Sequence, residues 1–86
     1  MSTADIERIM ASLPLFERVV EEYDISKVSH DCYGKELSCL RFLERNLIDA
    51  VSIYTEQAER IEKLITKVMV SRMLLETRVY AVNHSV

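Results

Sequence analysis

Apolar residues in the first part of the chain recur at helical spacing. Between residues 3 and 13 they return every three or four positions, and beyond Pro14 they do so again as far as Tyr23. A proline interrupts a helix or begins a new one, where its missing N–H costs nothing. The pattern therefore predicts two short amphipathic helices, or one bent helix, over residues 3–23.

The helical period is lost between residues 24 and 34. This stretch, DISKVSHDCYG, is rich in residues that are typical of loops, and it ends at the only glycine of the chain. The remaining residues, 35–86, contain neither glycine nor proline. We therefore expect residues 24–34 to link the short helices to one long helix over residues 35–82.

Two columns at seven-residue spacing run along the segment 35–82. Twelve of their fourteen positions are apolar, which is the signature of a coiled-coil-type helix packed along a seam. The column called d comprises Leu40, Leu47, Tyr54, Ile61, Val68, Leu75 and Val82, and the column called a comprises Leu37, Glu44, Val51, Ala58, Ile65, Arg72 and Val79.

A helix over residues 35–82 would be about 70 Å long at 1.5 Å per residue. The residues before it are too few to cover that length, so the seam must meet another copy, another protein or a folded-back part of itself. Folding back requires a break, for which residues 46–49 and 71–72 are the best candidates. Neither contains glycine or proline, so the pattern favours a continuous helix over a hairpin.

Glu44 and Arg72 interrupt the a column with opposite charges. In a parallel pair of chains each would face its own copy, whereas an antiparallel pair brings Glu44 of one chain close to Arg72 of the other. Unlike charges near a seam fix its register and orientation. We therefore predict an all-α fold packed as an oligomeric, antiparallel helical bundle, a homodimer first, with Leu37 opposite Val82 and with Glu44 and Arg72 setting the register.

The segment 68–82 is apolar nearly all round, which is typical of a helix that is buried on several sides. Leaving half of its apolar side chains in water would forgo on the order of 10 kcal/mol, so we expect association. Self-association alone and the binding of a protein client both fit this surface. The predicted interface residues are Leu40, Leu47, Val51, Tyr54, Ile61, Ile65, Val68, Met69, Met73, Leu74, Leu75, Val79 and Tyr80.

Composition and charge exclude several classes of protein. A chain of 86 residues, 49% apolar and 29% charged, makes one helical domain over residues 1–86. The net charge of −3 and the lack of a basic run argue against direct nucleic-acid binding. The most apolar window, 64–82, contains four charges, which argues against a membrane span. The acidic N-terminus lacks the pattern of a signal peptide, and two cysteines make no disulfide framework, so we expect a cytoplasmic protein.

The motif SHDCYGKE, residues 29–36, places reactive side chains next to one another. A cysteine nucleophile needs an oriented base, and acyl transfer needs an oxyanion hole, for which the chain offers no glycine-rich turn. A zinc site would draw on His30, Cys32 and Cys39, with His84 as a distant fourth ligand, but this cysteine spacing is not that of common zinc sites. We therefore predict that the protein is not an enzyme and has no catalytic residues, metal or cofactor.

These expectations favour a non-enzymatic helical protein–protein interaction module, such as a small adaptor, assembly factor or chaperone-like protein. It would homo-oligomerise and bury a partner helix in an apolar groove. A small dimeric transcriptional or signalling regulator is the alternative, acting by sequestering a protein because the chain lacks a basic face for DNA. A structural subunit of a larger helical assembly, such as a secretion apparatus, is the third hypothesis.

Overall fold

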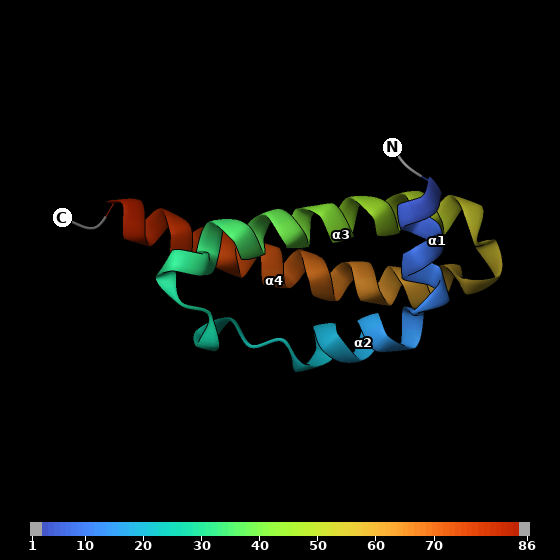
Figure 1. Ribbon diagram of the computed structural model, residues 1–86, viewed down its shortest axis with the longest axis horizontal. Coiled ribbons are helices and arrows are strands. Elements are labelled where there is room, and N and C mark those ends of the chain that lie inside the picture. Colours follow the sequence, from blue (N-terminus) through green and yellow to red (C-terminus); the bar gives the residue numbers. More distant parts are fainter. Residues whose placement is uncertain (1–2, 85–86) are drawn as a thin grey trace.

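The computed structural model describes residues 3–84, and within this range it contains helices and no strand (Figure 1). The all-α prediction is therefore confirmed. The α-helices are α1 (Thr3–Ala11), α2 (Leu13–Glu22), α3 (Tyr33–Ile53) and α4 (Ala58–His84), and the 3-10 helices are η1 (Ile25–Lys27), η2 (His30–Cys32) and η3 (Thr55–Gln57).

The N-terminal segment forms the two short helices that the apolar pattern predicts. Pro14 lies in the first turn of α2, where no intrahelical partner is needed for an N–H. The segment 24–34 links α2 to α3 through η1 and η2. Asp24 stabilises the start of η1, because its side chain accepts a hydrogen bond of 3.0 Å from the backbone N–H of Ser26.

The predicted continuous helix over residues 35–82 is wrong. α3 ends at Ile53, the chain turns through Tyr54 and η3, and α4 runs back antiparallel beside α3 (Figure 1). The break lies at neither 46–49 nor 71–72, which are both inside helices. It requires no glycine, because Tyr54 leaves the helical conformation through its ψ of 67° while its φ stays at −102°.

The two heptad columns pack against each other within one chain. Their central residues are buried in a core that also takes up Ile6, Leu13 and Val20 from the short helices. Full burial of one such side chain is worth about 1.5–3 kcal/mol. Folding back therefore supplies the burial that the sequence analysis expected from a second copy. The predicted interface residues that are buried in this core are Leu40, Leu47, Ile61, Val68 and Leu75.

Glu44 and Arg72 do form an ion pair, but they form it within one chain. Positions that face each other in an antiparallel pair have residue numbers with a constant sum, and this contact sets that sum near 116. The predicted register, in which Leu37 lies opposite Val82, is therefore shifted. Arg72 also pairs with Glu76, so both charged a positions are compensated by the hairpin itself.

The short helices cover the hairpin unevenly. α1 crosses α3 near the turn, and α2 runs along α4 without packing directly on α3 (Figure 1). Arg60 of α4 holds α2 in place by donating hydrogen bonds of 2.8 and 2.5 Å to the carboxylate of Glu17. The sides of α2 and α3 that face each other are consequently left uncovered.

Candidate functional site

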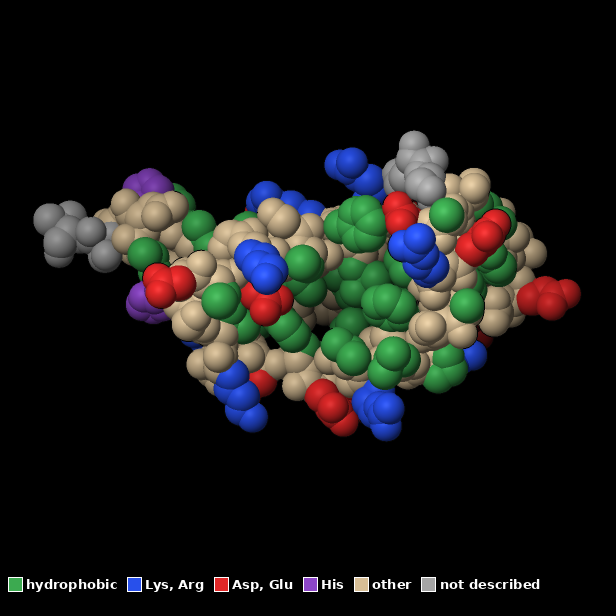
Figure 2. Space-filling model, in the orientation of Figure 1, with side chains coloured by type: hydrophobic (Ala, Val, Ile, Leu, Met, Phe, Trp, Pro, Cys, Tyr) green, Lys and Arg blue, Asp and Glu red, His purple; other side chains and the backbone are tan. Residues whose placement is uncertain are grey.

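An apolar groove lies between α2 and α3, with α4 as its floor (Figure 2). It consists of two adjoining hollows of about 150 and 400 Å³, which share Phe16, Cys39 and Leu43 in their walls. The larger hollow lies within the range of about 300–1,000 Å³ that is typical of binding pockets. We call this surface the groove, and its main residues are Ile9, Phe16, Val19, Tyr23, Cys39, Phe42 and Leu43.

Large apolar side chains stand at both lips of the groove. On α2, Phe16, Val19 and Tyr23 follow one another at spacings of three and four residues, which places them on one side of the helix. Val19 is 52% exposed, and Phe42 on the opposite lip is 54% exposed. Because exposed apolar area is unfavourable in water, a partner that covers both lips would gain free energy.

A polar contact closes one end of the groove. The hydroxyl of Tyr23 donates a hydrogen bond of 3.3 Å to Glu36 of α3. Burial, and after it the negative charge of Glu36, raises the pKa of Tyr23 to about 12. The hydroxyl therefore stays protonated and neutral at every physiological pH.

This contact predicts a loss of stability at high pH. Since the folded chain holds the Tyr23 proton more tightly than the unfolded chain, the contribution is complete below about pH 10. It is lost as the pH rises from there through the folded value of about 12. Urea unfolding of the wild type between pH 9 and 12 should show this decline, and Tyr23→Phe should flatten it. An unchanged slope in Tyr23→Phe would contradict the assignment.

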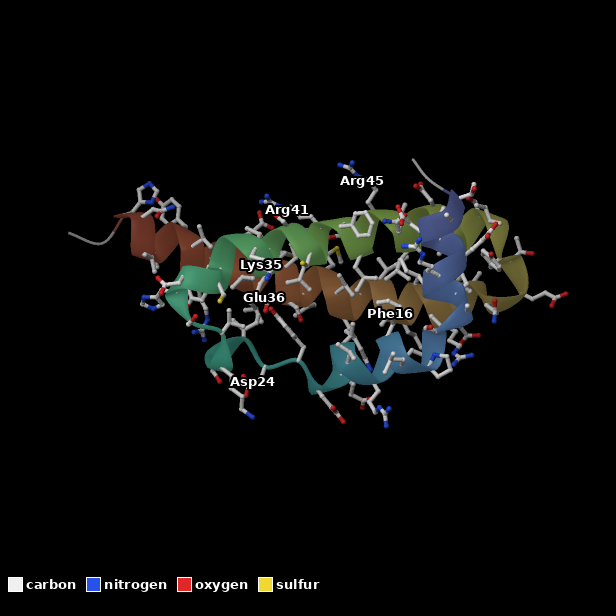
Figure 3. All side chains as sticks on the ribbon, viewed as in Figure 1. Phe16, Asp24, Lys35, Glu36, Arg41 and Arg45 are labelled. Carbon is white, nitrogen blue, oxygen red and sulfur yellow. The ribbon has the colours of Figure 1, made fainter. Side chains whose placement is uncertain are left out.

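The outer edge of α3 beside the groove is basic. Between residues 33 and 48 the exposed charged side chains are Lys35, Arg41 and Arg45, while Glu36 and Glu44 turn inward. Arg41 and Arg45 project from the edge of α3 that faces away from α2 (Figure 3). Arg41 lies 3.4 Å from Glu76, whereas Lys35 and Arg45 form no ion pair with residues 3–84. Lys35 and Arg45 therefore carry positive charges on the exposed surface of α3 that no ion pair within residues 3–84 neutralises.

A second apolar surface lies on the outside of α4. Its residues project opposite the buried Val68 and Leu75, because each residue turns the helix by about 100°. Between residues 66 and 84 no Asp, Glu, Lys or Arg falls on this side. Met73, Leu74 and Tyr80 are each more than half exposed. We call this surface the α4 outer face, and it comprises Met69, Val70, Met73, Leu74 and Tyr80.

The structure separates the predicted interface residues into three groups. Those buried in the core pack against residues of the same chain in this fold. Three others, Met73, Leu74 and Tyr80, lie on the α4 outer face and are exposed. The half-buried ones are Val51, Tyr54, Ile65, Met69 and Val79.

The groove lies outside the heptad pattern that predicts the seam. Cys39 and Phe42 lie on α3 outside both heptad columns. The sequence does contain apolar residues on α3 outside the seam and an apolar stripe on α2 that includes Phe16. Whether these two apolar surfaces face each other depends on how α2 packs, and the residue spacing along α3 does not specify that packing.

The residues considered for catalysis and zinc binding lie apart. His30 and Cys32 are on η2, whereas Cys39 is in the groove. His84 stacks on Tyr80, with ring centroids 3.9 Å apart. Across residues 3–84, no three side chains of His, Cys, Asp or Glu are grouped so that they could hold a metal ion.

Comparisons do not assign this chain to a known group. No family model, curated protein or solved structure matches it. In residues 3–84, no helix has the combination of length and apolar character that crossing a membrane requires.

Proposed function

We propose that this chain is a non-enzymatic protein–protein interaction module that binds an amphipathic helix of a partner protein in the groove. The observation that carries the proposal is that the groove between α2 and α3 is apolar and exposes Val19 and Phe42 at its two lips. In helix-in-groove binding, apolar anchors at positions i, i+3, i+4 and i+7 of the partner fill such a groove. This mode fits a small adaptor, an assembly factor or a chaperone-like protein.

The charges on the exposed side of α3 indicate which helix fits. Lys35 and Arg45 stand along the α3 side without ion pairs in the described part of the chain. A partner helix with carboxylates along the edge that lies over α3 would meet them. Charges at the rim of an interface set orientation and association rate more than affinity. We therefore infer a partner helix with an apolar stripe and an acidic flank.

The chain contains a reporter for this binding and a control for it. Cys39 lies in the groove and Cys32 lies outside it on η2, and both thiols are exposed. In the variants Cys32→Ser and Cys39→Ser, the single remaining thiol can be alkylated. A peptide with an apolar stripe and an acidic flank should slow the alkylation of Cys39 by about tenfold at a concentration of about ten times its Kd. The alkylation of Cys32 should not change.

A matched pair of variants tests whether the groove is responsible. Phe42→Glu places a charge on the lip of the groove, and Ile48→Glu places one on an exposed position of α3 outside it. Phe42→Glu should abolish the protection of Cys39, and Ile48→Glu should leave it intact. Equal slowing of both cysteines, or full protection in Phe42→Glu, would contradict the proposal. A basic-flanked peptide that binds as well as the acidic one would contradict only the inferred charge of the partner.

The α4 outer face supports a role with more than one partner. It is uncharged between residues 66 and 84 and is separate from the groove. An adaptor that joins two proteins, or a structural subunit that packs into a larger helical assembly, requires two such surfaces. A regulator that sequesters one protein requires only the groove. The second surface therefore favours the adaptor or the structural subunit over the regulator.

Self-association into an antiparallel bundle is also part of the proposal. The heptad pattern fits a second copy as well as it fits a hairpin, and the hairpin leaves Val51, Tyr54 and Ile65 only half-buried beside the turn. Apolar side chains in that state gain further burial when a second copy covers them.

A further inference from the structure

The seam of the hairpin is symmetric about Ala58. In the register set by their ion pair, Glu44 and Arg72 each lie fourteen residues from Ala58, on opposite sides of it and with opposite charges. The apolar seam positions lie close to the same symmetry. The residue numbers add to 116 for Leu37 with Val79 and for Val51 with Ile65, and to 115 for Leu40 with Leu75 and for Leu47 with Val68.

Two arrangements of the chain are equally consistent with these pairs across the seam. One chain can fold back near Ala58, so that α4 packs on α3 of the same chain. Alternatively, two straight chains can cross antiparallel with Ala58 on the twofold axis, so that each seam pair is formed twice between chains. The Glu44–Arg72 ion pair is retained in both.

The turn contains little that would resist straightening. Its residues, YTEQ, include no glycine or proline, and no residue in 3–84 has a positive φ. Tyr54 departs from the helical conformation mainly in ψ, and η3 is already a tight helical turn. The heptad columns continue through the turn at Tyr54, Ala58 and Ile61. A straight helix would therefore keep the seam in phase.

Straightening would also improve contacts near the turn. Val51, Tyr54 and Ile65 are half-buried in the hairpin and would lie inside a continuous seam. The backbone hydrogen bonds that close the turn are donated by Tyr54, Gln57 and Ala58. In a continuous helix the intervening amides would gain carbonyl partners as well.

We propose that a second copy of this chain exchanges with the first at this turn. Residues 33–84 straighten into one helix in each copy, and α4 of each copy packs on α3 of the other. The exchanged dimer keeps the α3–α4 seam and gains the contacts at the turn. Its formation costs the translational and rotational entropy of two separate chains. Protein concentration therefore governs the balance between the two forms. This inference does not rest on the proposed partner helix. In the exchanged dimer, α4 of the other copy takes the place of the chain's own α4 beside α2, because α2 packs on α4 and not on α3.

Distances within one chain distinguish exchange from the docking of two closed hairpins. Spin labels are attached at Ser38→Cys and Thr77→Cys, two exposed positions at the same end of the hairpin, in a chain with Cys32→Ser and Cys39→Ser. The labelled chain is diluted into unlabelled chain, refolded at high concentration and separated by size. Labels in the monomer should lie within about 20 Å, because packed helix axes are about 8–10 Å apart. Labels in the dimer should lie about 58 Å apart at 1.5 Å per residue.

Substitutions at the turn provide a second, matched test. Thr55 is the first residue of η3, and its N–H is not among the hydrogen bonds of the turn, so Thr55→Pro fits the hairpin. Proline also keeps the preceding Tyr54 out of the α conformation and so blocks the straight helix. Thr55→Pro should abolish the dimer while the monomer stays folded by circular dichroism. Thr55→Ala, which favours helix, should increase the dimer fraction.

The outcomes decide the proposal. A long intrachain distance in the dimer, together with loss of the dimer in Thr55→Pro, supports exchange. A dimer with only the short distance, a dimer that survives Thr55→Pro, or no dimer in either the wild type or Thr55→Ala overturns it.

Discussion

Replacing Leu47 by alanine is expected to destabilise the protein by about 3 kcal/mol. Leu47 is fully buried at the centre of α3, in the core that α3 shares with α4 and the short helices. Its loss removes the transfer free energy of the side chain and leaves a cavity that close-packed neighbours fill only in part. For a domain of this size, the melting temperature should fall by about 12–24 °C.

The neighbouring residue provides the control for this substitution. Ile48 lies on the same helix but is 53% exposed. Ile48→Ala should change stability by no more than about 0.5 kcal/mol, because exposed positions away from special features tolerate replacement. Both variants can be compared by urea unfolding and by thermal circular dichroism. Similar losses in the two would contradict the assignment of the core.

The core of the hairpin could be predicted from the sequence because periodicity reports which residues share a face. Leu40, Leu47 and Val68 are buried as the heptad columns indicate. The same columns do not say whether the partner helix belongs to the same chain. Facing residues have numbers with a constant sum both in a hairpin and in an antiparallel dimer. The pattern that predicts the core therefore does not predict which chain supplies the second helix.

The position of the turn was missed because the usual signals were absent. Tyr54 and η3 reverse the chain without glycine or proline. The available clue was the opposite charge of Glu44 and Arg72, because pairing them within one chain requires a reversal between them. Folding back is favoured when such a pair can form, because closing a short loop costs less than bringing two chains together.

Asn46 shows a different limit of sequence reasoning. It was part of a candidate break, yet it lies inside α3 and is only 1% exposed. Its amide donates a hydrogen bond of 2.9 Å to the carbonyl of Phe42, whereas its Oδ1 has no partner within residues 3–84. Polar residues are usually assigned to the surface. The burial of this position depends on how the helices pack on one another, and the local pattern does not contain that information.

Replacing Arg72 by methionine is the second substitution with a large expected effect. The guanidinium of Arg72 pairs with Glu44 and Glu76, and the side chains of Arg72 and Glu44 are only 23% and 15% exposed. Both contacts raise the pKa of Arg72, with Glu44 as the larger cause. Arg72→Met leaves Glu44 as an unpaired carboxylate in the seam. We expect a loss of about 2–3 kcal/mol, less than for a fully buried pair because some water still reaches the site.

The double variant Glu44→Met with Arg72→Met distinguishes the net contribution of the ion pair to stability from the cost of leaving one unpaired charge in the seam. Replacing both partners by apolar side chains of similar length removes the charge and extends the apolar seam, so the stability should return to within about 1 kcal/mol of the wild type or exceed it. Exchanging the charges, in Glu44→Arg with Arg72→Glu, should restore less. The carboxylate introduced at position 72 would then face Glu76 one turn away, and the guanidinium introduced at position 44 would face Arg41. Urea unfolding of the wild type, of the single variants Glu44→Met and Arg72→Met and of the double methionine variant gives the coupling energy directly, and a double methionine variant as unstable as Arg72→Met would show that the pair does not act as a unit.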